Sequence, residues 1–416
     1  MTVCLAPTQL VAQYQRVRSQ TEALCQPLAI EDYGLQAMAD ASPPKWHLGH
    51  TTWFFETFLL LPFLPGYRVH HPGYDYLFNS YYEAVGDRHP RHQRGLISRP
   101  TVAEVYTYRA AVDAAMAVLL EQQGDDPEIL SRTELGLHHE QQHQELLLMD
   151  ILYNLSVNPL QPAYRPDLSG AIAAVPSALA EPSWIDHPGG LVDSGAEAEG
   201  FHFDNEGPLH QVYLPPFRIA DRLVTNGEYL EFIEEGGYGQ AQWWLSEGWT
   251  TVNREGWQAP LYWQQRDGVW CQFTLAGLMP LERSAPVCHV SHFEADAYAR
   301  WRGGRLPMEG EWETVARTQP RTGNLLEGDR LRPIPGSGQW YGDAWEWTAS
   351  PYIAYPGYRP AAGALGEYNG KFMCNQMVLR GGACVTPADH IRPSYRNFFP
   401  SHSRWMFSGI RLGANL

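Results

Sequence analysis

A polar run at residues 138–145 constrains this chain more than any other stretch. It reads His-His-Glu-Gln-Gln-His-Gln-Glu and falls inside a helix predicted over residues 126–155. Positions four apart lie about 40° apart around a helix, so His139 and His143 project side by side and can hold one metal ion. A helix with solvated polar residues is the alternative, because two histidines make at most half a metal site.

The neighbours of this pair have different expected roles. Glu145 lies roughly 120° from His139 around the helix, so we expect it to orient a ligand rather than to bind the ion. Gln142 flanks the histidine face and could touch a molecule held at the ion. His138 points elsewhere.

A third ligand is offered by an earlier helix. It is predicted to begin at Pro43-Pro44 and to run to Glu56. A histidine inside its apolar stripe is costly unless it is paired or ligated. Bonding to a backbone carbonyl is one interpretation of His50, and ligation of an ion held by a facing helix of a bundle is the other. The stripe consists of Trp46, His50, Trp53, Thr57 and Leu60.

Helices are also predicted over residues 10–24 and 101–123, which completes a four-helix bundle. The segment 62–100 has no clear periodicity, and long loops in compact domains are usually functional or disordered. Its tyrosines could lie over the metal, and its arginines could meet a carboxylate. A loop packed on the bundle with solvated arginines is the alternative. The candidates are Tyr81, Tyr82, Arg88, Arg91 and Arg94.

Length and composition limit the class of protein. A chain of 416 residues predicts two domains or more, and a net charge of −16 argues against binding to nucleic acid or anionic membranes. No apolar run reaches the length of a membrane span, and the N-terminus lacks signal-peptide features, so we expect a soluble cytoplasmic protein. The six cysteines are scattered without a C-x-x-C pair, which favours reduced thiols.

The chain is expected to hold a helical domain over residues 1–158, a linker rich in Pro, Ala and Ser over 159–184, and a second domain over 185–416. The second domain combines short strands and many turns with helices predicted over residues 291–302 and 309–317. The predicted fold class is therefore α plus α/β.

Several motifs of the second domain resemble the formylglycine-generating-enzyme family, which implies a C-type-lectin-like fold. The paired oxidase cysteines of that family are not found, so its chemistry is not implied. The motifs are PVCHVS at 286–291, AYARW at 297–301, GRLPMEGEWE at 304–313, GDAWEW at 342–347, LRGG at 379–382 and GIRL at 409–412.

The first half resembles a DinB-like four-helix bundle. Its H-x3-H-x-E run and a W-x-L-x-H-like element ending at His50 resemble the non-haem iron site of ergothioneine sulfoxide synthases, which join these two domains in this order. The resemblance implies Fe(II) held by His50, His139 and His143. It implies O2, hercynine (trimethylhistidine) and a thiol as small-molecule partners, with no nucleic acid and no membrane.

The resemblance also assigns substrate contacts. It implies that Gln142 touches the hercynine imidazole and that the pair Arg396-Asn397 contributes to the pocket. Tyr81-Tyr82 resemble the tyrosine pair of a second branch of the family, where one tyrosine donates a proton or hydrogen bond during oxygen activation.

One departure bears on the thiol. The actinobacterial branch has an Asn-Trp-Asp run that binds the trimethylammonium group and the glutamyl part of γ-glutamylcysteine, whereas this chain has Asn397-Phe398-Phe399. Phe398 can offer a cation–π face, but Phe399 offers no carboxylate. We therefore expect cysteine to be favoured over γ-glutamylcysteine, with the arginines of segment 62–100 binding its carboxylate.

Other functions share parts of this pattern. Relatives that make ovothiol or the selenium analogue of ergothioneine carry the same motifs. A DinB-like zinc or nickel thiol transferase would need neither Tyr81-Tyr82 nor the fused second domain. A non-enzymatic lectin-like binding module would leave three convergent histidines without a purpose.

Overall fold

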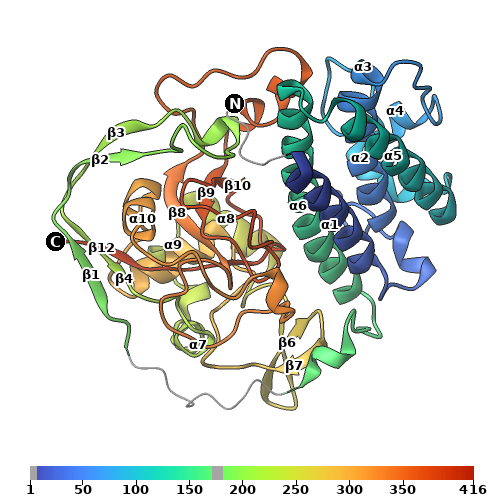
Figure 1. Ribbon diagram of the computed structural model, residues 1–416. Helices are drawn as coiled ribbons and strands as arrows, with labels where there is room; N and C mark the ends of the chain where they lie inside the picture. Colours follow the sequence, from blue (N-terminus) through green and yellow to red (C-terminus); the bar gives the residue numbers. More distant parts are fainter. Residues whose placement is uncertain (1–6, 171–180) are drawn as a thin grey trace. The chain divides into compact units, whose positions relative to one another are not determined.

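The computed structural model describes residues 7–170 and 181–416, so residues 171–180 of the predicted linker lie outside the described residues. The chain forms two compact units, coloured along the sequence in Figure 1. Of the described residues, the first contains 7–159, 197–203 and 359–370. The second contains 160–170, 181–196, 204–358 and 371–416.

The first unit is a helical bundle. Its four long helices run side by side in Figure 1 and differ from the predicted spans by a few residues at most. They are α1 (Pro7–Cys25), α2 (Pro44–Phe55), α5 (Val102–Gln123) and α6 (Pro127–Ser156). Two short helices, α3 (Leu61–Phe63) and α4 (Tyr74–Phe78), lie within the segment that lacks periodicity.

Local chemistry fixes the helix ends. Thr101 and Glu104 form a reciprocal capping box at the start of α5. The Asp126 carboxylate accepts two backbone N–H groups of the first turn of α6, where Pro127 also fits. Helix α2 continues directly into a π-helical turn, Glu56–Leu60.

Two glycines permit close packing around the histidines. A Cβ on Gly136 of α6 would lie 2.7 Å from the Phe55 ring of α2, and a Cβ on Gly49 would lie 2.2 Å from the Phe78 ring. Because Gly136 is three residues before His139, it lies on the histidine face of α6. The small residue therefore lets this face approach α2.

The second unit is built from short strands in four small sheets, ordered β10-β9-β8-β11, β1-β4-β12, β5-β6-β7 and β2-β3. Strand β11 pairs parallel with β8, and the other strand pairs are antiparallel. The strands are β1 (Trp184–His187), β2 (Gly190–Ser194), β3 (His210–Leu214), β4 (Phe217–Ala220), β5 (Trp263–Arg266), β6 (Val269–Thr274), β7 (Gly277–Pro280), β8 (Trp345–Pro351), β9 (Met377–Arg380), β10 (Asn397–Phe399), β11 (Ser408–Gly409) and β12 (Gly413–Asn415).

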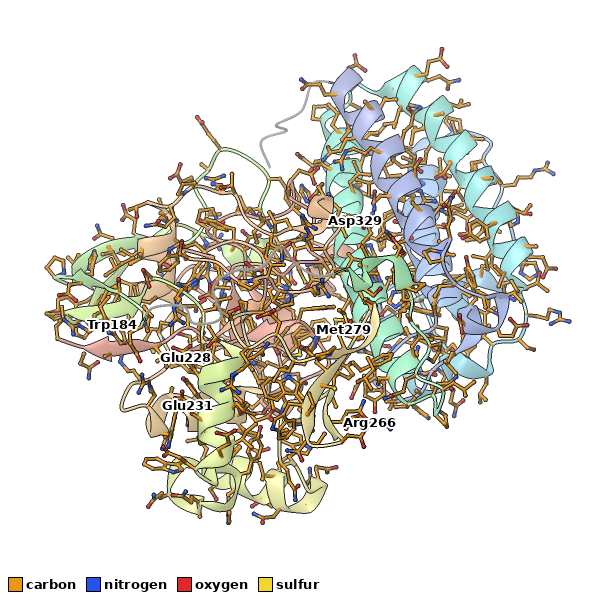
Figure 2. The ribbon with its side chains drawn as sticks, turned by 90° about the horizontal axis from the view of Figure 1, so that it is seen from below. Trp184, Glu228, Glu231, Arg266, Met279 and Asp329 are labelled. Atoms are coloured by element: carbon orange, nitrogen blue, oxygen red, sulfur yellow. The ribbon has the colours of Figure 1, made fainter. Side chains whose placement is uncertain are left out.

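Helices flank these sheets, and α9 and α10 pack against β8. Figure 2 shows Glu228 and Glu231 on α7, with Arg266 and Met279 on the sheet β5-β6-β7. The helices are α7 (Asn226–Glu234), α8 (Ser246–Glu255), α9 (His292–Trp301) and α10 (Glu309–Ala316).

The motifs that carried the resemblance of the second domain meet in its core. The fully buried Glu346 accepts hydrogen bonds from the Arg411 guanidinium and from Trp312 Nε1. These three residues come from three separate motifs, so the motifs specify a buried network. A buried carboxylate needs such partners, because an unpaired charge there is strongly destabilising. The motifs therefore indicate a fold rather than a reaction.

Candidate metal centre

Helices α2 and α6 bring three buried histidines together in the first unit. His50, His139 and His143 each offer a ring nitrogen, and these atoms lie within 4.8 Å of one another. His50 Nε2 lies 3.1 Å from His139 Nε2. The structure thus gives the three predicted ligands the spacing of a metal site.

The hydrogen bonds of His50 leave one nitrogen free for an ion. Its Nδ1 lies 2.6 Å from the Phe78 carbonyl oxygen, which can only accept, so Nδ1 carries the proton. Its Nε2 lone pair then faces the other rings. The two interpretations of His50 from the sequence are therefore compatible, because the carbonyl bond fixes the tautomer that ligation requires.

The three rings are neutral in this setting. Burial lowers the pKa of His139 to about 3, and burial with the neighbouring histidines holds the pKa of His50 and of His143 well below the ordinary range. Neutral imidazoles are the form that binds a metal. Three neutral imidazoles whose ring nitrogens converge are a donor set that fits a bound metal ion.

Aromatic rings surround the histidines. Trp46 stacks on His50 with ring centres 4.6 Å apart, and Phe54 lies 4.7 Å from His139. Trp53 stacks on the His50 ring at 5.7 Å. Such a wall limits water and strengthens electrostatic interactions inside the site.

A tyrosine that no sequence pattern marks lies beside Gln142 and His139. The Tyr368 hydroxyl donates a hydrogen bond to Gln142 Oε1, and its ring meets His139 edge-on at 5.6 Å. The Tyr368 ring also stacks on the Phe203 ring, with ring centres 5.4 Å apart. Both aromatic residues belong to later segments that fold with the first unit. No sequence periodicity marks them, so only packing reveals their place.

The predicted tyrosine pair contacts the aromatic rings that border the histidines. Tyr82 packs against Trp53 and Phe58, and Tyr81 stacks on Tyr82 and meets Tyr368 edge-on at 6.3 Å. Burial raises the pKa of Tyr82 well above the ordinary value, so this phenol keeps its proton.

The structure separates the three candidate arginines. Arg88 is partly exposed and pairs with Glu83, and Arg91 is exposed and donates to the Asp40 carbonyl. Arg94 is buried, donates to Ser42 Oγ, and lies 3.3 Å above the Trp46 ring that stacks on His50. Burial lowers its pKa well below the usual range. Of the three, Arg94 is the one joined to the histidine cluster by ring contacts.

The remaining predicted residues belong to the second unit. Arg396 is buried and bonds Glu309 through two nitrogens, so its charge is already matched there. Asn397 Oδ1 accepts from the Phe398 backbone N–H. The Phe398 ring stacks on Tyr352 at 4.0 Å, which covers one of its faces.

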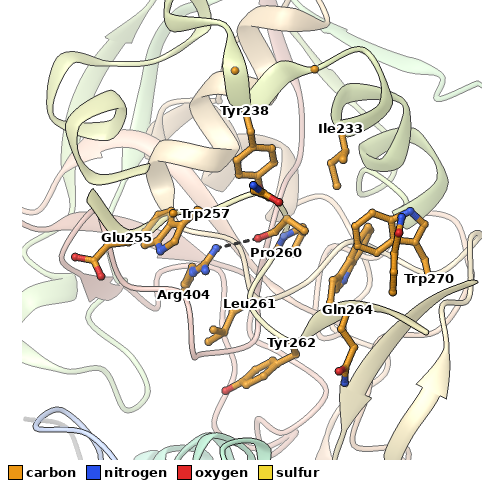
Figure 3. Close-up of a pocket in the computed structure, with 17 residues that line it drawn as sticks. Ile233, Tyr238, Glu255, Trp257, Pro260, Leu261, Tyr262, Gln264, Trp270 and Arg404 are labelled. Carbon is orange, nitrogen blue, oxygen red and sulfur yellow. Dashed lines mark hydrogen bonds between the residues drawn. The ribbon is translucent and has the colours of Figure 1, made fainter. Parts of the chain in front are cut away.

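A cavity of about 680 Å³ opens in the second unit beside α8. Figure 3 shows Tyr238, Trp257, Tyr262 and Arg404 around it. None of the predicted site residues is among those that line it. Within the part of the chain that the structure describes, every helix is too short or too polar to cross a membrane.

The comparisons with known proteins agree with this architecture. The DinB superfamily model matches residues 13–147, and the model of the sulfatase-modifying factor enzyme 1-like domain matches residues 171–333 and 334–416. The fold and site thus define a DinB-type bundle, carrying a buried three-histidine centre, joined to a domain of the formylglycine-generating-enzyme type.

Full-length relatives narrow the class. The chain is 34% identical to hercynine oxygenase of Mycolicibacterium smegmatis over 89% of this chain and 90% of that protein. It is 33% identical to hercynine oxygenase of Mycobacterium tuberculosis over 98% and 99%. Ergothioneine biosynthesis protein 1 of Schizosaccharomyces pombe is 28% identical over 52% of this chain and 28% of that protein. The chain belongs to the hercynine oxygenase family, which confirms the family predicted from the motifs.

Proposed function

We propose that this protein is an O2-dependent non-haem Fe(II) sulfoxide synthase of ergothioneine biosynthesis. It joins the sulfur of a thiol, with cysteine favoured, to C2 of hercynine and oxidises that sulfur. The buried cluster of His50, His139 and His143 in a hercynine oxygenase family member is the observation that carries this proposal. The free cysteines of the described residues suit a reducing cytoplasm.

Iron suits the donor set. His50, His139 and His143 would hold the iron as neutral imidazoles, and the iron would supply the redox chemistry that joins the thiol, the imidazole substrate and O2. The protein's own contribution is a dry, rigid pocket. The Phe78 carbonyl holds His50 through a hydrogen bond, and Trp46 and Trp53 both stack on the His50 ring.

Gln142 and Tyr368 form the polar side of this pocket. Gln142 lies one residue before His143, and its side chain accepts the Tyr368 hydroxyl proton. The amide group of Gln142 would then face an imidazole substrate, as the family resemblance implies. Tyr368 would hold the proton closest to the ligands, with Tyr81 and Tyr82 behind it as the alternative donors.

The thiol donor is assigned from charge. A γ-glutamyl group adds a second carboxylate and places the ammonium farther from the thiol, where both need buried partners, and Phe399 cannot provide a carboxylate for that ammonium. Cysteine needs one carboxylate matched. Arg94 offers a buried guanidinium beside the cluster, while Arg88 and Arg91 stand nearer the surface. Phe398 and Asn397 remain the proposed contacts of the trimethylammonium group of hercynine. Arg396 would position these two residues.

Product analysis tests the proposal. Anaerobically iron-loaded protein is given hercynine with equal amounts of cysteine and γ-glutamylcysteine, exposed to O2, and examined by mass spectrometry. The expected product is the cysteine sulfoxide conjugate in at least roughly tenfold excess, equivalent to about 1.4 kcal/mol of discrimination. O2 uptake without any conjugate would contradict the reaction, and equal conjugates would contradict only the choice of thiol.

A further inference from the structure

A fourth buried histidine links the metal ligands to a carboxylate. His47 lies one helical turn before His50 on α2, and its Nδ1 lies 2.9 Å from His143 Nδ1. Its other nitrogen, Nε2, lies 3.2 Å from Asp150 Oδ2 on α6. Both residues of this link are buried. His47 is not part of the group whose nitrogens converge, so it is not a ligand here.

The protons in this chain of bonds have one consistent arrangement. The Asp150 carboxylate accepts the Ser42 backbone N–H at 2.8 Å and accepts from His47 Nε2. A neutral imidazole carries one N–H, so His47 Nδ1 must be an acceptor. The facing His143 Nδ1 must then be the donor. This leaves the lone pair of His143 on Nε2, the nitrogen that can point at a metal ion.

We propose that His47 and Asp150 are a positioning pair that holds His143 in the Nδ1–H tautomer and so sets its strength as a metal ligand. The inference rests on the metal site of the proposed function and extends it. A carboxylate behind a ligating histidine fixes the ring and raises its basicity. Here the carboxylate acts through a second imidazole, which lengthens the link by one ring.

A purely structural role would need less than this. Asp150 alone satisfies the one N–H of a buried neutral His47, and a backbone N–H or a hydroxyl could satisfy its acceptor nitrogen. Instead the second nitrogen of His47 is directed at a ligand. The three ligands are then held differently: His50 by a carbonyl, His143 by the positioning pair, and His139 with no partner at Nδ1 among the described residues.

The test uses the full-length protein with Co(II) as the probe. Binding is measured by competition with a chelator, and the exchangeable ring N–H protons of the ligands are followed by paramagnetically shifted proton NMR. The variants are Asp150→Asn, which can turn its amide N–H toward His47, and His47→Gln, which keeps an amide oxygen as acceptor for His143 but removes the imidazole that joins His143 to the Asp150 carboxylate. Glu56→Gln is the control, because Glu56 is an equally buried carboxylate that accepts from Tyr67 and Tyr108 instead.

Asp150→Asn and His47→Gln should weaken Co(II) binding by roughly 10–100-fold and shift one ring N–H signal, while Glu56→Gln stays within about twofold of the wild type. If Asp150→Asn does not fold, Asp150→Glu and His47→Gln decide. Wild-type affinity with unchanged ring signals in both His47→Gln and a folded Asp150 variant would overturn the proposal. A wild-type protein that binds neither Co(II) nor Fe(II) would instead remove the metal site and the proposed function.

Discussion

At the scale of single residues, a few buried polar side chains define the chemistry. The histidine cluster has three ring nitrogens in one place, and Arg94 has its guanidinium over Trp46 rather than against a carboxylate. Such arrangements cost stability in an empty site. Substitutions at these positions should therefore change ligand binding while the protein stays folded.

The metal ligands give the first prediction. His50→Ala, His139→Ala and His143→Ala should each weaken Fe(II) binding more than roughly a hundredfold, beyond the range for outer-shell partners. Iron content and chelator competition measure this. His138→Ala is the control, since His138 is the adjacent buried histidine and stacks on Phe201 instead. Full iron retention in the His50 variant would place the third ligand elsewhere.

The second prediction concerns the thiol carboxylate. Arg94→Ala should raise the cysteine KM by roughly 10–100-fold, the equivalent of a charge-assisted hydrogen bond of about 1.5–3 kcal/mol, and should change the hercynine KM less. Steady-state kinetics with each substrate varied in turn provide the measurement. Arg88→Ala and Arg91→Ala serve as comparisons. If either of these raises the cysteine KM more than Arg94→Ala does, the carboxylate lies nearer the surface.

The third prediction ranks the phenols. Because Tyr368 contacts both Gln142 and His139, Tyr368→Phe should divert turnover from C–S coupling toward cysteine sulfinic acid more than Tyr81→Phe or Tyr82→Phe. The ratio of the two products by mass spectrometry measures this for each variant. An unchanged ratio in Tyr368→Phe with an altered ratio in Tyr82→Phe would return the proton to the tyrosine pair.

At the scale of elements, the contact between α2 and α6 decides whether the ligands can meet. The close approach at Gly136 leaves no room for a methyl group against Phe54 and Phe55. Since Gly136 shares a helix face with His139, overpacking there displaces the histidine-bearing face as well as the core.

The fourth prediction follows from that contact. Gly136→Ala should lower the free energy of unfolding by about 1–3 kcal/mol, despite the better helix propensity of alanine, because the added methyl overpacks the core. Chemical denaturation measures the change. Gly34→Ala is the matched control, since a Cβ there meets nothing within 4 Å. Equal effects at both positions would show that the α2–α6 spacing is not set by Gly136.

At the scale of the whole molecule, a buried carboxyl group couples the stability of the second unit to pH. In the second unit, burial raises the pKa of Asp343 to about 6, although Asn324 and the Ile334 N–H donate to it. The folded state therefore binds this proton more tightly than the unfolded chain does. The stabilising contribution is full below about pH 4 and is lost as the pH rises through about 6.

The fifth prediction uses this linkage. Asparagine does not titrate, so the wild type should gain stability relative to Asp343→Asn on acidification from pH 7 to pH 4. The gain should be on the order of 3 kcal/mol. Hydrogen exchange of peptides around Asn324 and Asp343 measures it within the second unit. A stability difference that does not change with pH would mean that this carboxyl is not perturbed by burial.

Much of the fold could be predicted from local patterns. The four long helices of the first unit, and α9 and α10 of the second, lie within a few residues of the expected spans, because apolar periodicity, caps and prolines act over one or two turns. Helices α7 and α8 were not predicted. The i, i+4 spacing placed His139 and His143 on one face, and a polar residue in an apolar stripe marked His50. The motifs of the second domain indicated its family, since their residues must meet in a buried network.

The tertiary structure decided what no local pattern carries. It placed Tyr368 beside Gln142, placed Arg94 over the Trp46 ring, and joined His47 and Asp150 to His143 across two helices. These contacts bring together residues far apart in sequence, and helical periodicity says nothing about which distant segment will cover a face. The sequence by itself determined which side chains could bind a metal ion. Only three-dimensional packing determined how each of these side chains is held and which residues contact it.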